Sequence, residues 1–179
     1  YDYSMVENMY ENRDTSKPFF LFNVTMQNHG GYAMSYTNFS QEIYVTNMNG
    51  IYPKANRYLS LVKRSDEAFQ ELVDYFSNVS EPTIICMFGD HLHSIEDGFY
   101  EELFGTSLDQ LTTEQQQLRY TTPFVIWANY DIPEATLNQI SANYLSTLVL
   151  QTAGLPLTQY NRYLASLYQK LPIINTVGY

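Results

Sequence analysis

An apolar segment that ends in an adjacent carboxylate and imidazole is the part of this sequence best suited to chemistry. Thr83–Phe88 carries no charge and is followed by Gly89, which lets the backbone turn, and then by Asp90 and His91. Such a run suits a strand buried on both faces of a parallel sheet. Because open α/β sheets hold ligands at the carboxyl ends of their strands, Asp90 and His91 fall where a site is expected. Carboxylate oxygens and imidazole nitrogens bind divalent cations, so the pair is a candidate metal site.

A structural explanation of the same pair stands beside this one. Asp90 can cap the next helix while His91 is a polar loop residue, because Asp-His pairs are common and no third ligand is adjacent in the sequence. The dipeptide alone does not separate these two interpretations.

A second loop histidine, His29, follows another predicted strand. Phe19–Thr25 is short and rich in aromatic and β-branched residues, which favours a buried strand, and it leads into a polar cluster with two glycines. Since neighbouring parallel strands end at the same edge of a sheet, we expect His29 to lie within about one side-chain length of Asp90 and His91. The alternative is a solvated loop histidine with no role.

Apolar periodicity and capping residues predict the elements that would position these side chains. A strand, a crossover helix and a second strand in sequence predict a parallel pair with right-handed connection. The predicted fold class is therefore α/β, with a mostly parallel central sheet flanked by helices. The predicted helices are Asp2–Asn12, Pro53–Phe76, Glu96–Phe104, Thr112–Tyr120, Asn138–Ala153 and Thr158–Gln169; a third strand is predicted at Pro123–Ala128 and a long ordered loop at Tyr32–Tyr52.

Length, charge and cysteine content limit the classes of function. A chain of 179 residues is long enough for one sizeable core. A net charge of −10 argues against nonspecific attraction to nucleic acid or to an anionic membrane surface. Cys86 is the single cysteine, which excludes an internal disulfide framework. Because the sequence begins at Tyr1 rather than Met, we expect an amino-terminal part to precede it.

Several blocks of the sequence, in the same order, resemble the sulfatase-like branch of the alkaline phosphatase superfamily, nearest the lipoteichoic acid synthase and phosphoglycerol transferase proteins. The resemblance runs from about Lys17 to Pro156 and is more specific than any one block. The blocks are Phe19–Tyr32, Asn56–Phe76, Met87–His91 and Pro123–Trp127.

The resemblance implies roles for the candidate residues. Asp90 and His91 match two ligands of an active-site divalent metal ion, which would be manganese, magnesium, calcium or zinc. His29 matches a histidine that contacts the phosphate or glycerol of the substrate. The implied parent protein is a bacterial phosphoglycerol transferase or a sulfatase or phosphodiesterase, anchored in the membrane with its catalytic domain outside the cytoplasm. Its implied substrates are phospholipids or cell-envelope polymers.

The sequence departs from the family pattern in two respects. The family's threonine nucleophile and a further acidic metal ligand lie in an amino-terminal half that has no counterpart here. We therefore expect residues 1–179 to be the carboxyl-terminal part of one catalytic domain, with a metal site that is often empty and no activity in isolation. Many relatives have proline where this chain has His93, and a neutral substitution is preferred over an extra polar contact beside the metal.

A noncatalytic α/β module, whose tyrosine-rich loops bind a glycan or a protein, is the alternative function.

Overall fold

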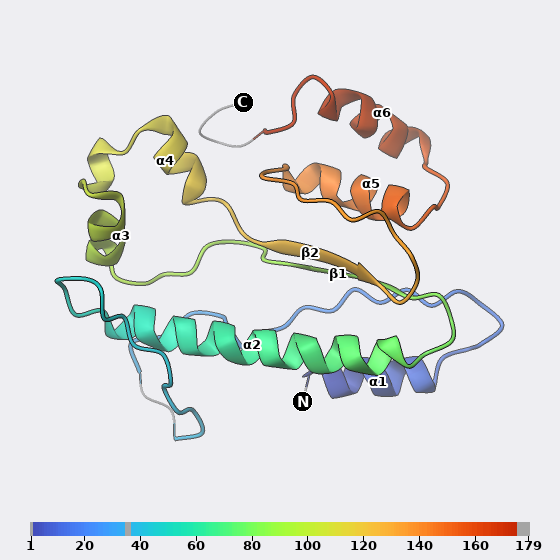
Figure 1. Ribbon diagram of the computed structural model, residues 1–179, viewed down its shortest axis with the longest axis horizontal. Helices are drawn as coiled ribbons and strands as arrows, with labels where there is room; N and C mark the ends of the chain where they lie inside the picture. Colours follow the sequence, from blue (N-terminus) through green and yellow to red (C-terminus); the bar gives the residue numbers. More distant parts are fainter. Residues whose placement is uncertain (1, 35–36, 175–179) are drawn as a thin grey trace. The chain divides into compact units, whose positions relative to one another are not determined.

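The computed structural model describes residues 2–34 and 37–174 (Figure 1). The chain divides into two compact units. Unit 1 comprises Tyr1–Val79 and His93–Leu108, and unit 2 comprises Ser80–Leu92 and Asp109–Tyr179.

Unit 1 is built on a long helix. It contains α1 (Asp2–Glu11), α2 (Pro53–Ser77) and α3 (Asp97–Phe104), which confirms the three helices predicted there. α1 packs along α2, with the ring of Tyr10 edge-on to that of Phe76 at 5.1 Å between centroids (Figure 1). The apolar stripe of α2 therefore supplies much of the interior of unit 1.

The start of α2 is capped from another element. Tyr52, the residue before the helix, makes no side-chain cap, so the first backbone N–H groups need other acceptors. The Glu96 carboxylate accepts from the N–H of Lys54 at 2.7 Å and from that of Ala55 at 3.1 Å. Because Glu96 directly precedes α3, one carboxylate joins the first turns of two helices.

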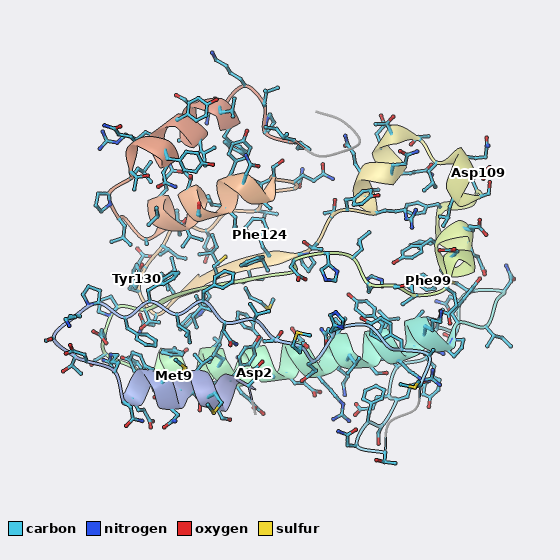
Figure 2. The ribbon with its side chains drawn as sticks, turned by 180° about the vertical axis from the view of Figure 1, so that it is seen from behind. Asp2, Met9, Phe99, Asp109, Phe124 and Tyr130 are labelled. Atoms are coloured by element: carbon cyan, nitrogen blue, oxygen red, sulfur yellow. The ribbon has the colours of Figure 1, made fainter. Side chains whose placement is uncertain are left out.

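The sheet of unit 2 has two strands, β1 (Ile84–Phe88) and β2 (Phe124–Ala128). They pair antiparallel, from Ile84 opposite Ala128 to Phe88 opposite Phe124, so the expectation that both belong to a mostly parallel sheet is wrong for this pair. The connection after β1 leaves and returns at the same end of the pair, which an antiparallel ladder allows without a crossover. Figure 2 labels Phe124 at the start of β2 and Tyr130 just beyond its end.

The strand predicted at Phe19–Thr25 is also wrong. This segment is irregular, and in the described part of the chain only β1 and β2 form a ladder. β-Propensity measures how well side chains fit a pleated, half-buried surface, and it does not by itself specify a ladder with another strand. Large apolar side chains stay exposed along the segment and just beyond it: Phe20 (87%), Phe22 (66%), Val24 (63%) and Met26 (63%).

Three further helices and a short 3-10 helix complete the helical elements of the described residues. η1 (Leu108–Gln110) spans the junction between the units. In unit 2, α4 (Thr113–Leu118), α5 (Ala142–Thr152) and α6 (Gln159–Tyr168) confirm the predicted helices, although α5 starts four residues later than Asn138. α5 and α6 lie side by side and share a buried bond from Asn161 Nδ2 to Thr147 Oγ1 (Figure 1). None of the described helices has the length and apolar character needed to cross a membrane.

Candidate functional site

The end of β1 lies tightly against the residue pair that precedes β2. The N–H of Gly89 donates to the Pro123 carbonyl at 3.1 Å, and Thr122 Oγ1 donates to the Gly89 carbonyl at 2.7 Å. A Cβ at Gly89 would lie only 2.9 Å from the Thr122 Cβ. Gly89 does not have positive φ, so the sequence-based reason for this glycine is corrected: it is required for close approach rather than for an unusual turn.

Asp90 and His91 follow Gly89 and hold each other in a defined orientation. Asp90 Oδ1 accepts from the His91 backbone N–H at 2.9 Å, and Asp90 Oδ2 lies 3.5 Å from His91 Nε2. His91 Nδ1 lies 2.8 Å from the Leu92 carbonyl oxygen. Because a carbonyl only accepts, Nδ1 is the donor in this contact, so Nε2 is the ring nitrogen that faces Asp90 Oδ2.

This geometry fits two positions around a divalent ion. A tetrahedral ion with ligands at about 2.0–2.2 Å separates neighbouring ligand atoms by about 3.4 Å. The separation of Asp90 Oδ2 and His91 Nε2 is 3.5 Å. The two side chains are 73% and 65% exposed, so a cation can reach them. Within the described residues, no three His, Cys, Asp or Glu side chains gather into a group that could hold a metal ion.

The structural explanation of Asp90 as a helix cap does not apply. α3 begins at Asp97 and its N-cap position is Glu96, whereas the hydrogen bond of the Asp90 carboxylate goes to the neighbouring residue His91. The Asp90 carboxylate thus contacts His91 rather than the first turn of α3.

The predicted substrate residue His29 is exposed on a turn in unit 1, where its N–H donates to the Met26 carbonyl at 3.1 Å. The residue before it, Asn28, is fixed on both sides: its carbonyl accepts from the Tyr32 hydroxyl, and its Oδ1 accepts from Ser65 Oγ at 3.1 Å. Gly31 has φ of 113°, a conformation that other L-residues rarely adopt. Asp90 and His91 belong to unit 2, so the expected proximity of His29 to them stays a prediction.

An aromatic cluster in unit 1, which the sequence reasoning missed, surrounds His93. The His93 ring stacks on Tyr58 with 3.7 Å between centroids and 14° between planes, and its Nε2 lies 2.9 Å from the Tyr100 hydroxyl. Burial lowers the pKa of His93 from its ordinary value, so the neutral ring is favoured. His93 therefore has specific partners, and their distance in the sequence explains why no local pattern revealed them.

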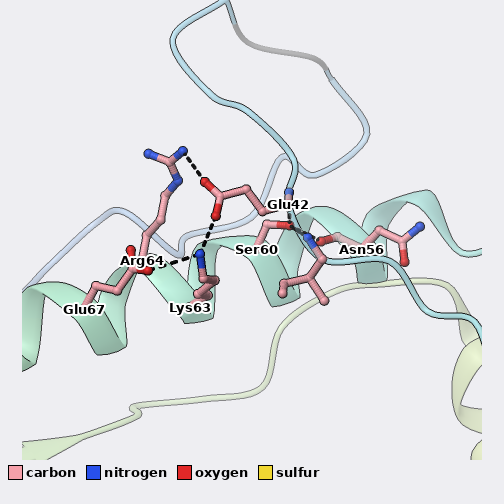
Figure 3. Close-up of polar contacts among 7 residues, drawn as sticks. Glu42, Asn56, Ser60, Lys63, Arg64 and Glu67 are labelled. Atoms are coloured by element: carbon pink, nitrogen blue, oxygen red, sulfur yellow. Dashed lines mark hydrogen bonds and ion pairs between the residues drawn. The ribbon is translucent and has the colours of Figure 1, made fainter.

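The loop that follows the His29 turn is ordered along α2, as expected for its described part. Ser60 Oγ accepts from the N–H groups of Glu42 at 3.0 Å and Ile43 at 2.9 Å (Figure 3). Asn56 Oδ1 accepts from the N–H of Val45 at 2.7 Å. Ser60 is 1% exposed and Asn56 is half-buried, so these side chains give acceptors to the backbone of a segment without secondary structure.

Carboxylates hold the same loop near its middle and at its carboxyl end. The Glu42 carboxylate pairs with Lys63 and, at 2.9 Å, with Arg64, and its pKa is lowered mainly by the Lys63 hydrogen bond (Figure 3). The Glu102 carboxylate accepts from the Asn49 and Gly50 N–H groups and, at 2.6 Å, from the Tyr52 hydroxyl.

Comparison with solved structures supports the fold class. The structure of Streptococcus pyogenes phosphoglycerol transferase GacH in complex with sn-glycerol-1-phosphate matches with a TM-score of 0.65 and 16% identity, over 98% of this chain and 43% of that one. At this identity the match shows the fold, which confirms the sulfatase-like fold class of the chain.

Sequence comparison gives a related result. A putative cyclic beta-1,2-glucan modification protein of Rhizobium meliloti is 28% identical over 173 residues, which cover 90% of this chain and 26% of that protein. The chain therefore spans about a quarter of the length of this relative. The family model described as Sulfatase matches residues 1–155. The chain belongs to the sulfatase family.

Proposed function

We propose that the protein containing this chain is a metal-dependent enzyme that transfers phosphoglycerol to a cell-envelope polymer, glycan or lipid. The observation that carries this proposal is the arrangement of Asp90 Oδ2 and His91 Nε2, 3.5 Å apart at the end of β1. The names of the two similar proteins support the reaction and the acceptor: one is a phosphoglycerol transferase, and the other is named a cyclic beta-1,2-glucan modification protein.

The roles proposed for the residues follow from their contacts. Asp90 and His91 would provide two ligands for one divalent ion, manganese, magnesium, calcium or zinc, and the Leu92 carbonyl orients the imidazole. The bound ion would supply charge stabilisation to an oxygen of the reacting group. His29 would donate a hydrogen bond to that group, and the fixed backbone around Asn28 limits its movement. A threonine nucleophile and a third ligand would come from another part of the same domain.

The location proposed for the parent protein is the extracytoplasmic face of a bacterial membrane, where envelope polymers and phospholipid donors meet. Hydrolysis of a phosphodiester or of a sulfate ester is the second reaction that the same ligands could support, because both proceed through charge on non-bridging oxygens. Sulfatase family membership keeps this second reaction open.

The proposal is tested with the full-length protein. Release of diacylglycerol from phosphatidylglycerol, and transfer of glycerol phosphate to an envelope glycan, are measured after chelation and after return of each divalent ion. We expect chelation to remove activity and one ion to restore it. Asp90→Ala, His91→Ala and His29→Ala should each lower turnover at least about a hundredfold.

Asp131→Ala is the matched control, because Asp131 is an exposed carboxylate of unit 2 outside the proposed site. Full activity of the Asp90→Ala and His91→Ala proteins would overturn the metal assignment. Binding of a glycan without any turnover by the intact protein would favour the noncatalytic module instead.

A further inference from the structure

Tyr58, on the first half of α2, holds two aromatic rings from distant parts of the sequence. The ring of Tyr32 meets it edge-on, at 5.6 Å between centroids and 68° between planes. The ring of His93 stacks on it at 3.7 Å and 14°. All three residues belong to unit 1, and Tyr58 itself is half-buried. A single ring on a long helix thus contacts both the loop after His29 and the segment after His91.

The Tyr32 side of this contact reaches the residue before His29. Tyr32 is 5% exposed and its hydroxyl donates to the Asn28 carbonyl. The Tyr32 carbonyl in turn accepts from Arg57 Nη1 at 2.5 Å. Since Arg57 and Tyr58 are neighbours on α2, both the backbone and the ring of Tyr32 are attached to the same helical turn.

The His93 side reaches the chain that carries the proposed metal ligands. His93 is the second residue after His91, and its Nε2 lies 2.9 Å from the hydroxyl of Tyr100, which is 8% exposed. With one face on Tyr58 and an edge on Tyr100, the imidazole has little freedom to rotate. The backbone that follows His91 is therefore held at His93, two residues after the proposed ligand.

We propose that Tyr58 is a positioning residue for the reaction of the proposed enzyme: its ring fastens the turn before His29 and the segment after His91 to α2. The inference rests on the proposed function, because it assigns work to Tyr58 only if His29 and the Asp90–His91 pair serve the same reaction. Catalytic groups displaced by about 1 Å can lose about a hundredfold in rate, so the fastening acts on turnover rather than on contact with substrate.

Steady-state kinetics of the full-length protein test the inference. Tyr58→Leu removes the ring, and we expect kcat to fall about tenfold to a hundredfold while KM changes less than about threefold. Tyr58→Phe keeps the ring and should restore kcat to within about twofold. Tyr144→Leu is the control for stability alone, since Tyr144 is a buried tyrosine of unit 2 that packs on Tyr168 and donates to the Leu171 carbonyl. Assayed well below its unfolding temperature, this control should keep its kcat.

Hydrogen exchange provides a readout besides activity. His93→Ala is a second variant, to be used if Tyr58→Leu does not fold. Loss of either ring should speed exchange in peptides that cover residues 28–32 and 92–95 together, whereas Tyr58→Phe should leave both protected. Unchanged kcat and unchanged exchange in folded Tyr58→Leu or His93→Ala protein would overturn the positioning role. Activity that also survives His29→Ala and Asp90→Ala would instead overturn the proposed function itself.

Discussion

Gly89 shows how one absent side chain shapes the end of β1. Its backbone exchanges bonds with Thr122 and Pro123, and an added Cβ would lie 2.9 Å from the Thr122 Cβ. We expect Gly89→Ala to lower the free energy of unfolding by about 1–3 kcal/mol, because the neighbouring backbone must move apart. Since Asp90 is the next residue, the full-length Gly89→Ala protein should also bind its metal ion less tightly. Chemical denaturation and metal titration check the two effects.

The control for this substitution is Gly98→Ala. Gly98 lies in the first turn of α3, and its added Cβ would meet the nearest atom, Tyr52 Cε1, at an ordinary 3.6 Å. Alanine favours helix over glycine, so stability should stay the same or rise by up to about 1 kcal/mol. An equal loss of unfolding free energy in both variants would show that the close approach of Thr122 is not what requires glycine at position 89.

The hydrogen bond from Tyr52 to Glu102 should give stability a dependence on pH at both ends of the scale. It raises the pKa of Tyr52 to about 12, with burial as the second cause, and it is the main cause of the lowered pKa of Glu102. The stabilisation that accompanies the raised pKa of Tyr52 is fully present below pH 10 and is lost between pH 10 and about 12. The stabilisation that accompanies the lowered pKa of Glu102 is present above pH 4.5, the ordinary pKa of the group, and is lost as the pH falls below that value.

Thermal unfolding of the wild-type and Tyr52→Phe proteins across this range measures the effect. The advantage of the wild type should be greatest and constant between about pH 5 and 10, and should shrink on either side. A difference that stays constant down to pH 3 and up to pH 12 would contradict the coupling of these two side chains.

At the scale of elements, Ser60 is what allows an irregular segment to lie against α2. Its Oγ, 1% exposed, accepts two backbone N–H groups and donates to the Asn56 carbonyl at 2.8 Å (Figure 3). Ser60→Ala removes the acceptor and leaves the N–H groups of Glu42 and Ile43 without it. We expect a loss of about 1–3 kcal/mol in the free energy of unfolding, measured by denaturation, together with faster hydrogen exchange at residues 42–45.

Lys63→Ala is the contrasting variant on the same helix. Lys63 pairs with Glu42 and Glu67 but is 44% exposed, so solvent screens both pairs (Figure 3). Its removal should barely change stability or exchange. A larger loss in Lys63→Ala than in Ser60→Ala would mean that charge, rather than backbone acceptors, holds the segment.

The helices were predictable from the sequence because their signals are local. Pro53 and the apolar stripe of α2, the capping box of Thr112 and Gln115, and Gly105 with φ of 69° all lie within a few residues of the features they cause. Strand pairing depends on residues far apart. Phe88 opposite Phe124 could not be read from either segment, and Phe19–Thr25 has strand-like residues but belongs to no sheet among the described residues.

The residues of the candidate site were also predictable only where their pattern is local in the sequence. Asp90 and His91 were found because they are adjacent at a strand end, a local pattern. The Tyr32, Tyr58 and His93 cluster and the acceptors for Glu42 and Ile43 were missed, because each joins segments that only the fold brings together. Glu96 was equally invisible as the cap of α2, since its partners lie 41 and 42 residues earlier.

At the scale of the molecule, the metal chemistry of the 179-residue chain is limited by its ligands. Catalytic ions are commonly held by three or more protein ligands. Among the described residues, no third His, Cys, Asp or Glu joins Asp90 and His91 in a group that could hold a metal ion. Two ligands leave most coordination positions of the ion to water, so the affinity for the ion should be low.

We therefore predict that this chain alone binds manganese, magnesium, calcium or zinc weakly and neither transfers glycerol phosphate nor hydrolyses a phosphodiester or aryl sulfate. Isothermal titration of the purified chain with each ion measures the first part, and turnover assays at saturating ion measure the second. Asp90→Ala should remove the weak binding, whereas Asp131→Ala, which changes the same charge elsewhere in unit 2, should keep it. Turnover by the chain that disappears in Asp90→Ala would show that a nucleophile and a complete ligand set lie within these 179 residues.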